Sequence, residues 1–447
     1  MSPLSAAAFR TQYALSPALP TTPSNQAALQ KAFEPASSAG RILAEILSLG
    51  LSFVVCMLLL PIYFLSYPVY GRPPTVAPVA SVLGVLAKAL TSPQPPLFTR
   101  VMLIILLCRR LFLIPSTSVA CHLDSFLYRA QMDAVTVRAP VFMISGARSG
   151  STTLGHLLDQ DSNFVSPAGI MTALPCLWMW KLAAFLSKVG LLPSKEAAAA
   201  KIIAHADERA PEFTARHELN PFKPDTFEVP WLCNRHFFGV SYDIGVDQMM
   251  ANLPLSDRRV DAELWADFDV YIDDIMKKVL LFNGQPDKRV MIKGHFLAAA
   301  EGLERRYPDA SFLTVIRDRK QRMTSLMNFM ITNRLIVADT SVVPTKQNIL
   351  DVGETIMRTE PDYIEKEKEF FAGEGKRKIA VPFEDYVKDV GRVLETVYGV
   401  VNGKGGAVPD DIKEAMVKGK EGHTNRAKMK YHIKLSLAEF GIDEAKL

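Results

Sequence analysis

A short apolar run at residues 141–144 (VFMI) leads directly into a turn of small and polar residues, 145–153 (SGARSGSTT). Leucines at positions 154, 157 and 158 then share one helical face, so the segment predicts a buried strand, a turn and a helix in succession. A turn at a helix N-terminus presents backbone N–H groups and the positive end of the helix dipole. We therefore expect an anion-binding loop here, on an α/β fold.

Two further apolar runs end in basic residues. Residues 289–292 (RVMI) lead to Lys293, and residues 311–316 (SFLTVI) lead to Arg317. Apolar runs that alternate with helical patterns are typical of a parallel sheet flanked by helices. In such sheets, ligands bind beyond the carboxyl ends of the strands. We therefore expect Arg148, Lys293 and Arg317 to meet at one edge, where they would bind a multiply anionic ligand.

The turn after the first strand differs from the loop that binds ATP or GTP. That loop has the pattern GxxxxGK[ST], and its lysine reaches the β- and γ-phosphates. Here Ser151 stands in the place of the lysine, and the spacing from Gly146 to Gly150 is one residue short. A kinase or other nucleotide phosphotransferase is therefore a disfavoured alternative. A catalytically inactive nucleotide-binding protein is another, although all three basic residues at the strand ends are present.

The motifs resemble those of sulfotransferases that use 3′-phosphoadenosine 5′-phosphosulfate (PAPS). Residues 148–153 (RSGSTT) are similar to the family's 5′-phosphosulfate loop, and Arg317 with Ser325 eight residues later matches its 3′-phosphate motif. Residues 293–295 (KGH) look like the family's K-T-H element, and residues 307–310 (YPDA) like a segment that precedes the next strand. The likeness is greatest to the membrane-bound and bacterial-type branch.

The resemblance covers residues 138–335 well and implies a P-loop-type parallel sheet flanked by helices, with the sulfotransferase domain at residues 136–447. It implies PAPS as co-substrate and no metal. Arg148 and Lys293 would offset charge on the leaving phosphate oxygen. The residues that would bind PAPS are Arg148, Ser149, Gly150, Ser151, Thr152, Thr153, Arg317 and Ser325.

Two residues are rival candidates for the base that accepts the proton of the acceptor hydroxyl. The resemblance and a pKa near neutrality favour His295, although a structural histidine is the alternative interpretation. Glu228 is the rival because related membrane-type members use an acidic residue from the segment that follows the loop. His217 and His236 are weaker candidates.

A long insert separates the first two strands. Between Arg148 and Lys293 lie far more residues than in small cytosolic members, and we expect residues 164–280 to form the acceptor pocket and lid. Its aromatic residues, Trp178, Trp180 and Trp231 among them, suit a sugar ring or a lipid groove, or are ordinary core residues. Toward the C-terminus, the charge run 365–369 (EKEKE) predicts a solvated helix face. Residues 418–422 (KGKEG) weakly resemble a nucleotide-binding element, and residues 431–443 resemble the C-terminus of this branch.

The N-terminal region has the pattern of a membrane protein. Residues 46–71 carry no formal charge, which predicts a transmembrane anchor at residues 43–71. Pro61 and Pro68 would kink this helix or end it early. We expect a disordered tail at residues 1–42 and a proline-rich and amphipathic juxtamembrane region at 72–135, in which residues 101–114 lie on the membrane surface as a basic amphipathic helix.

Charge and composition exclude some partners and suggest a location. Residues 1–120 carry eight Lys/Arg and two acidic residues, but no dense basic patch of the kind that binds nucleic acid. The five cysteines lack zinc-binding spacing. The anchor together with the family resemblance predicts a single-pass protein of the Golgi or another endomembrane that acts on a glycan or lipid hydroxyl. The acid-poor tail leaves a plastid address as an alternative.

Overall fold

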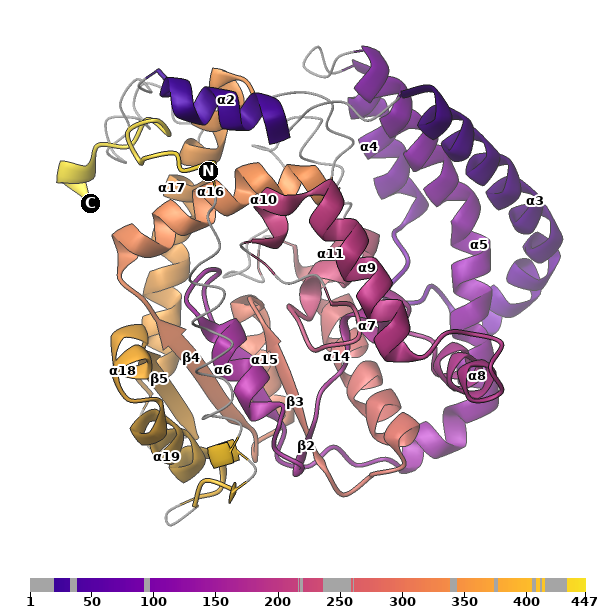
Figure 1. Ribbon diagram of the computed structural model, residues 1–447. Helices are drawn as coiled ribbons and strands as arrows, with labels where there is room; N and C mark the ends of the chain where they lie inside the picture. The colour runs from indigo at the N-terminus through magenta and orange to yellow at the C-terminus, as the bar shows by residue number, and fades with distance from the viewer. Residues whose placement is uncertain are drawn as a thin grey trace.

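A parallel five-stranded sheet in the order β2-β3-β1-β4-β5 forms the centre of the computed structural model (Figure 1). The structure describes residues 20–32, 38–91, 97–215, 217, 220–235, 259, 261–337, 344–373, 377–403, 407–410, 412–414 and 432–447. The strands are β1 (Val141–Ile144), β2 (Phe164–Val165), β3 (Arg289–Gly294), β4 (Ser311–Ile316) and β5 (Lys378–Pro382). The three strands predicted from apolar runs are thus present, and they pair in parallel as expected.

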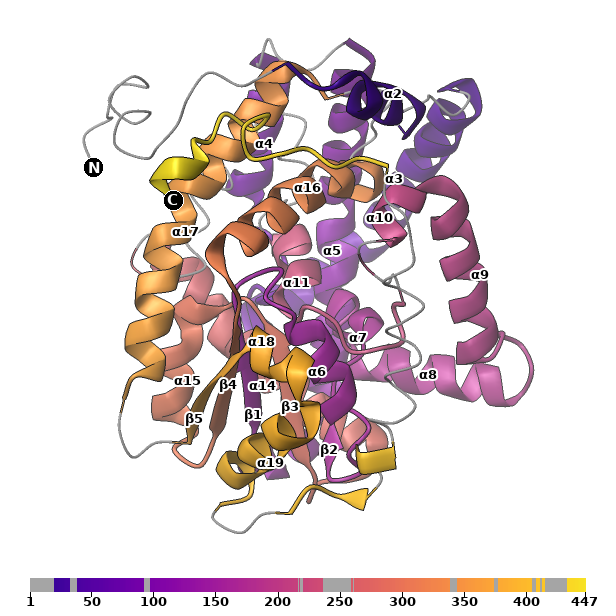
Figure 2. The same cartoon turned by 60° about the vertical axis from the view of Figure 1, so that its left-hand side comes forward.

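The alternating side chains of β1 enter two different cores. Its odd-numbered residues pack with α6 (Ser151–Leu158) and α19 (Val390–Val401). Its even-numbered residues pack on the other face with α14 (Ala262–Asn283). Figure 2 shows α6, α18 and α19 on the near side of the sheet and α14 and α15 behind it. Both faces are covered, which is why the strands read as continuous apolar runs.

The remaining helices complete these two layers and add an N-terminal group. They are α2 (Pro23–Ala32), α3 (Ser38–Tyr70), α4 (Val79–Thr91), α5 (Leu97–Ala134), α7 (Gly169–Ala173), α8 (Leu177–Lys188), α9 (Lys195–Arg209), α10 (Pro211–Thr214), α11 (Glu228–Arg235), α15 (Ala300–Arg306), α16 (Arg319–Val337), α17 (Lys346–Phe371) and α18 (Phe383–Lys388). Short 3-10 turns occupy Leu297–Ala299 and Glu444–Lys446.

Helices α3, α4 and α5 stand together beside the half of the molecule that contains the sheet (Figure 1). Two stretches, Leu43–Tyr70 and Arg100–Ala134, are long and apolar enough to cross a membrane. Helix α3 continues through Pro61 and Pro68 to Tyr70, contrary to the early end that these prolines predicted. Packing along α5 stabilises the helix over its whole length and offsets the hydrogen bonds that the prolines remove.

The expected domain boundaries differ from the structure at two places. The tail predicted as disordered over 1–42 contains α2, and residues 1–19 of it lie outside the described residues. Helix α2 is ordered because a distant segment covers it: Asn25 exchanges hydrogen bonds with the backbone of Lys434, and Leu29 is buried beside Ile433. Second, most of the juxtamembrane region 72–135 is helical, and α5 extends far beyond residues 101–114.

The expected insert, residues 164–280, contains β2, the helices α7 to α11 and most of α14. The tryptophans of this segment do not form an open aromatic surface. Trp231 is fully buried and its indole N–H donates to the Pro74 carbonyl at 3.0 Å, while Trp180 donates to the Leu174 carbonyl at 2.6 Å. Burial of large rings on both sides of α14 stabilises the core here, so Trp180 and Trp231 are core residues.

Candidate active site

The turn between β1 and α6 is fixed to both neighbouring strands. The backbone N–H of Ser145 donates to the Gly294 carbonyl of β3 at 3.1 Å. The Ser145 hydroxyl accepts a hydrogen bond from the N–H of Val315 in β4 at 3.0 Å. The buried Glu367 of α17 links the turn to β4. Its carboxylate accepts hydrogen bonds from the N–H of Gly146 at 3.2 Å and from the Thr314 hydroxyl at 2.7 Å. The loop is therefore pre-organised by the sheet.

Two residues of this loop have left-handed backbone conformations. Arg148 has φ of 65° and Gly150 has φ of 98°. A Cβ on Gly150 would lie 2.6 Å from ring atoms of Phe383, so glycine is required both by the backbone and by the contact. Gly150 is also the N-cap of α6, which has no side-chain cap. The N-terminus of α6 therefore faces the carboxyl edge of the sheet, in the geometry of an anion site.

Arg148, Ser325 and Arg317 form one connected cluster. The Arg148 Nε donates to the Ser325 hydroxyl at 3.1 Å, and Arg317 Nη1 donates to the Arg148 carbonyl at 3.3 Å. Each guanidinium also lies over a ring: Arg148 is 5.1 Å from the centre of Phe329, and Arg317 is 4.6 Å from the centre of Phe383. Residues from the end of β4, from α16 and from the loop thus meet at one edge, while Lys293, which the sequence grouped with Arg148 and Arg317, contacts the insert instead.

Lys293 lies at the end of β3 and is buried. Its Nζ donates to the Thr226 hydroxyl at 3.2 Å and lies 3.7 Å from an Asp225 oxygen. Burial lowers the pKa of this ammonium group and Arg148 adds to the effect, while Asp225 and Glu228 oppose it. Burial alone would raise the pKa of Asp225, but its hydrogen bond from His217 at 3.0 Å and the nearby Lys293 hold that pKa well below the usual range.

His295 is held at its ring and at its backbone. Its Nδ1 lies 2.5 Å from the Ser145 carbonyl oxygen and therefore carries the proton, which leaves the lone pair on Nε2. Its backbone N–H donates to Glu228 Oε1 at 3.0 Å. Burial, with Lys293 nearby, lowers the pKa of His295 to about 3. The imidazole is therefore neutral at physiological pH.

Glu228 begins α11 and is 1% exposed. Burial raises the pKa of its carboxyl group to about 7. One carboxylate oxygen accepts the hydrogen bond from the backbone N–H of His295, and the other has no hydrogen-bond partner among the described residues. The side chain packs against Gly294, where a Cβ would collide with it. Glu228 thus supports the end of β3 from within the core.

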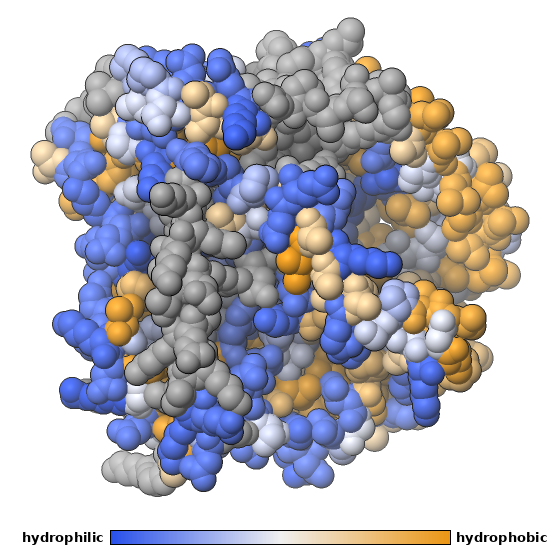
Figure 3. Space-filling view, in the orientation of Figure 1, coloured by the Kyte–Doolittle hydropathy of each residue, from blue (hydrophilic) through white to orange (hydrophobic). Residues whose placement is uncertain are grey.

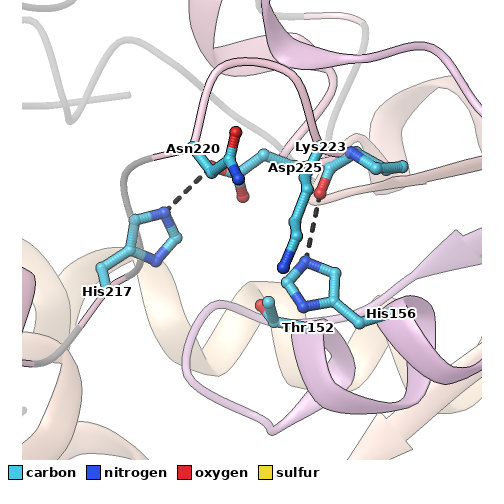
Figure 4. Close-up of a pocket in the computed structure, with 7 residues that line it drawn as sticks. Thr152, His156, His217, Asn220, Lys223 and Asp225 are labelled. Atoms are coloured by element: carbon cyan, nitrogen blue, oxygen red, sulfur yellow. Dashed lines mark hydrogen bonds and ion pairs between the residues drawn. The ribbon is translucent and has the colours of Figure 1, made fainter. Parts of the chain in front are cut away.

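A pocket adjoins these residues on the side of the insert. It is a small, partly open hollow lined by Thr152, His156, His217, Asn220, Lys223, Pro224 and Asp225. Figure 4 shows His217 directed at Asp225, and His156 of α6 directed at the Pro224 carbonyl, which lies 3.2 Å from its Nε2. The pocket thus lies between α6 and the insert.

The sequence model of the sulfotransferase family matches residues 140–402, more than half of the chain. The chain belongs to the sulfotransferase family. Its fold is similar to that of sulfotransferase STF1 from Mycobacterium tuberculosis, with 17% identity, a TM-score of 0.53, and coverage of 85% of this chain and 94% of that one. Sulfotransferase STF9 from Mycobacterium avium is 16% identical, with a TM-score of 0.51 and coverage of 81% and 87%. No curated protein matches the sequence.

Family membership and fold agree on sulfuryl transfer as the general chemistry of this sulfotransferase. Both solved structures are bacterial, so the likeness supports neither the Golgi nor the plastid location expected from the sequence. Within the described ranges, no three His, Cys, Asp or Glu side chains are grouped as metal ligands.

The structure places the predicted site residues of this family member in two adjoining groups. Arg148, Arg317 and Ser325 form the first, and Lys293, His295 and Glu228 the second; Thr152 faces the pocket between α6 and the insert. Ser149 is fully buried, and its hydroxyl lacks a partner among the described residues. Of the weaker candidates, His217 lines the pocket, while His236 lies outside the described residues, as does the 418–422 element.

Several residues that shape the site were not predicted from the sequence. Glu367 was predicted to lie on a solvated helix face, but it is buried under the loop because two donors of the loop and β4 converge on it. Phe383 could have been found, since it ends the apolar run 379–383 and hence stands at a strand end. Asp225 and Thr226 carried no such signal: they contact Lys293 from a loop of the insert.

Proposed function

We propose that the chain transfers the sulfuryl group of PAPS to a hydroxyl of a glycan or lipid acceptor at a membrane surface. The observation that carries this proposal is the cluster of Arg148, Arg317 and Ser325 at the ends of β1 and β4. Such a cluster offers charge and donors beyond the anion loop itself. It would bind a second phosphate, the 3′-phosphate that separates PAPS from ATP.

In this proposal the loop 148–153 holds the 5′-phosphosulfate on backbone N–H groups and the α6 dipole. Ser151, Thr152 and Thr153 lie in the first turn of α6, and the hydroxyls of the two threonines are candidate donors. Arg148 and the buried Lys293 stabilise negative charge on the phosphate oxygen from which sulfur departs. A charge buried beside the reacting atoms acts more strongly than one in water.

His295 accepts the proton in this proposal. The acceptor oxygen bonds to sulfur, the bond from sulfur to the phosphate oxygen breaks, and the acceptor proton goes to Nε2 of His295. Its low pKa keeps the base deprotonated before the reaction, and an anionic co-substrate nearby raises that pKa and strengthens the base. Because Glu228 is buried, it acts through the backbone of His295 and is a positioning residue rather than the base.

Calorimetry with 3′-phosphoadenosine 5′-phosphate, ADP and ATP tests this proposal on the full chain. We expect tight binding of the 3′-phosphorylated nucleotide only. In Arg317→Ala and Ser325→Ala its affinity should fall by about tenfold or more, since hydrogen bonds to charged groups contribute about 1.5–3 kcal/mol each. Arg305→Ala is the matched control because Arg305 is an exposed arginine of α15.

Equal binding of the three nucleotides would refute the PAPS site. A preference for ATP that survives both substitutions at the cluster would favour the kinase alternative, and absence of binding would favour an inactive relative.

A further inference from the structure

Helix α3 exposes one continuous apolar stripe. Leu51, Leu58 and Leu65 follow one another at intervals of seven residues on one side of the helix and are 67%, 70% and 79% exposed. The opposite side, with Ser52 and Cys56, is buried. Figure 3 shows this apolar surface over α3 at the right of the view and more of it around α8 below. An exposed patch of this extent marks a surface for a partner or a membrane.

Both ends of α3 are bound to α5, which runs beside it in the same direction. Near the start of α3, Glu45 pairs with Arg109 at 2.7 Å. Near its end, the Ser66 hydroxyl lies 2.7 Å from Nδ1 of His122, whose Nε2 donates to the Gly71 carbonyl at 2.8 Å. The contacts at both ends hold α3 along α5 over its apolar length.

Helix α5 is in turn bound to the catalytic half along the same stretch of the helix that contacts α3. Arg110 donates to Asn234 of α11 at 2.8 Å. Nearly three turns further on, the Ala120 carbonyl accepts the indole N–H of Trp178. Asp124 caps the N-terminus of α8 and pairs with Lys278 of α14 at 2.9 Å. A bilayer set across α3 would therefore have to contain α8, α11 and α14 as well.

The contacts of α2 indicate that the segments before and after α3 lie on the same side of a membrane. Helix α2 precedes α3, and the catalytic half follows it. Yet α2 packs on the C-terminal segment: Asn25 and Lys434 exchange two hydrogen bonds, and Glu439 accepts from Thr22 and Asn25. A single crossing by α3 would place α2 and its partner on opposite sides of the membrane, which these contacts forbid.

We propose that α3 lies in the plane of the membrane interface instead of crossing it, with its apolar stripe in an anionic phospholipid surface and both chain ends on the same side. This differs from the spanning anchor that the sequence alone predicts for residues 43–71. Exposed Leu182 and Phe185 of α8 extend the apolar surface, and Lys88, Lys181 and Lys188 supply charge for acidic headgroups. The inference rests on the membrane association proposed above and not on the sulfuryl-transfer chemistry.

The first experiment measures flotation of the full chain with vesicles of phosphatidylcholine and phosphatidylserine. We expect binding that weakens at least about tenfold in the double variant Leu58→Glu/Leu65→Glu, because two apolar side chains leave the lipid. Val387→Glu is the matched control, since Val387 is similarly exposed, at 65%, on α18. Nucleotide binding should be equal in all three proteins and shows that they are folded. Failure of the wild-type chain to float, or equal flotation of both variants, would refute the lipid surface.

The second experiment distinguishes an in-plane helix from a crossing one. The wild-type chain carries one epitope tag at residue 1 and a different one at residue 447, and the vesicles are treated with protease without detergent. The in-plane arrangement predicts that the protease digests both tags or neither tag. Opposite fates would show that α3 crosses the bilayer and would overturn the proposal. Neither readout depends on enzyme activity, so failure here is distinct from failure of the proposed function.

Discussion

The backbone N–H of His295 donates to the Glu228 carboxylate at 3.0 Å, while the ring of the same histidine is fixed by the Ser145 carbonyl. The two contacts act from opposite parts of the residue. Glu228 holds the end of β3, and Ser145 sets the tautomer and the direction of the ring. The Nε2 lone pair is therefore aimed by the fold itself, before any substrate binds.

Removal of this imidazole should separate chemistry from binding. In His295→Ala we expect the turnover number to fall by about 10²–10⁴-fold, as is usual for a lost general base. The affinity for 3′-phosphoadenosine 5′-phosphate should stay within about twofold, since the proposed nucleotide contacts are the loop and Arg317 and do not include His295. Initial rates and calorimetry measure the two effects, with the exposed His205 of α9 replaced by alanine as control. An unchanged turnover number would assign His295 a purely structural role.

The buried Glu228 should make stability depend on pH. Its pKa is raised from 4.5 to about 7 in the folded protein, so its contribution is fully present below about pH 4.5 and is lost as pH rises through about 7. Urea unfolding should therefore show a wild-type loss of about 2–3 kcal/mol from pH 5 to 8.5 that Glu228→Gln lacks. A parallel pH dependence in the two proteins would show that this carboxyl group is not the cause.

Gly150 should tolerate no side chain. In Gly150→Ala the new Cβ meets the Phe383 ring on a backbone with φ of 98°, so the loop has to shift and nucleotide affinity should fall at least about tenfold. Gly399→Ala is the matched control, because a Cβ at that helical glycine has nothing within 4 Å. Calorimetry on both variants measures the difference. Full affinity in Gly150→Ala would mean that the loop binds in another conformation.

Lys278 should stabilise the packing of α5, α8 and α14 against one another. It pairs with Asp124 at 2.9 Å and Asp274 at 2.6 Å in a buried site. Lys278→Met leaves the buried Asp124 and the half-buried Asp274 without their cation and should lower the free energy of unfolding by about 3–5 kcal/mol. The neighbouring Lys277 is partly exposed, so Lys277→Met should cost less than about 1 kcal/mol in the same urea titration. Equal losses would contradict this assignment.

The sheet and half of the site could be predicted from the sequence because their signals are local. The strands β1, β3 and β4 are short apolar runs, Lys293 and Arg317 stand at the ends of β3 and β4, and Arg148 lies in the turn after β1. Parallel pairing then brings these residues to one edge without further information. Helix α14 could likewise be predicted, since the apolar residues of 264–282 recur at helical spacing.

The remaining features depend on contacts between distant residues. Glu367 lies in a charge run that predicts a solvated face, and only the loop above it makes it a buried acceptor. The order of α2 depends in the same way on Lys434, and the burial of Trp231 depends on a carbonyl of Pro74. Composition cannot report such partners, because each is supplied by a segment far away in the chain.

The pairing of Asn25 with Lys434 also has a consequence for the order of events during synthesis. The two residues are 409 positions apart. At about 5–20 residues per second, α2 leaves the ribosome tens of seconds before its partner exists. During that interval the apolar α3 is available to a membrane while the body that later flanks it is still incomplete. The lipid contact can thus precede the fold, and closure of α2 onto the C-terminal segment becomes the last step of assembly.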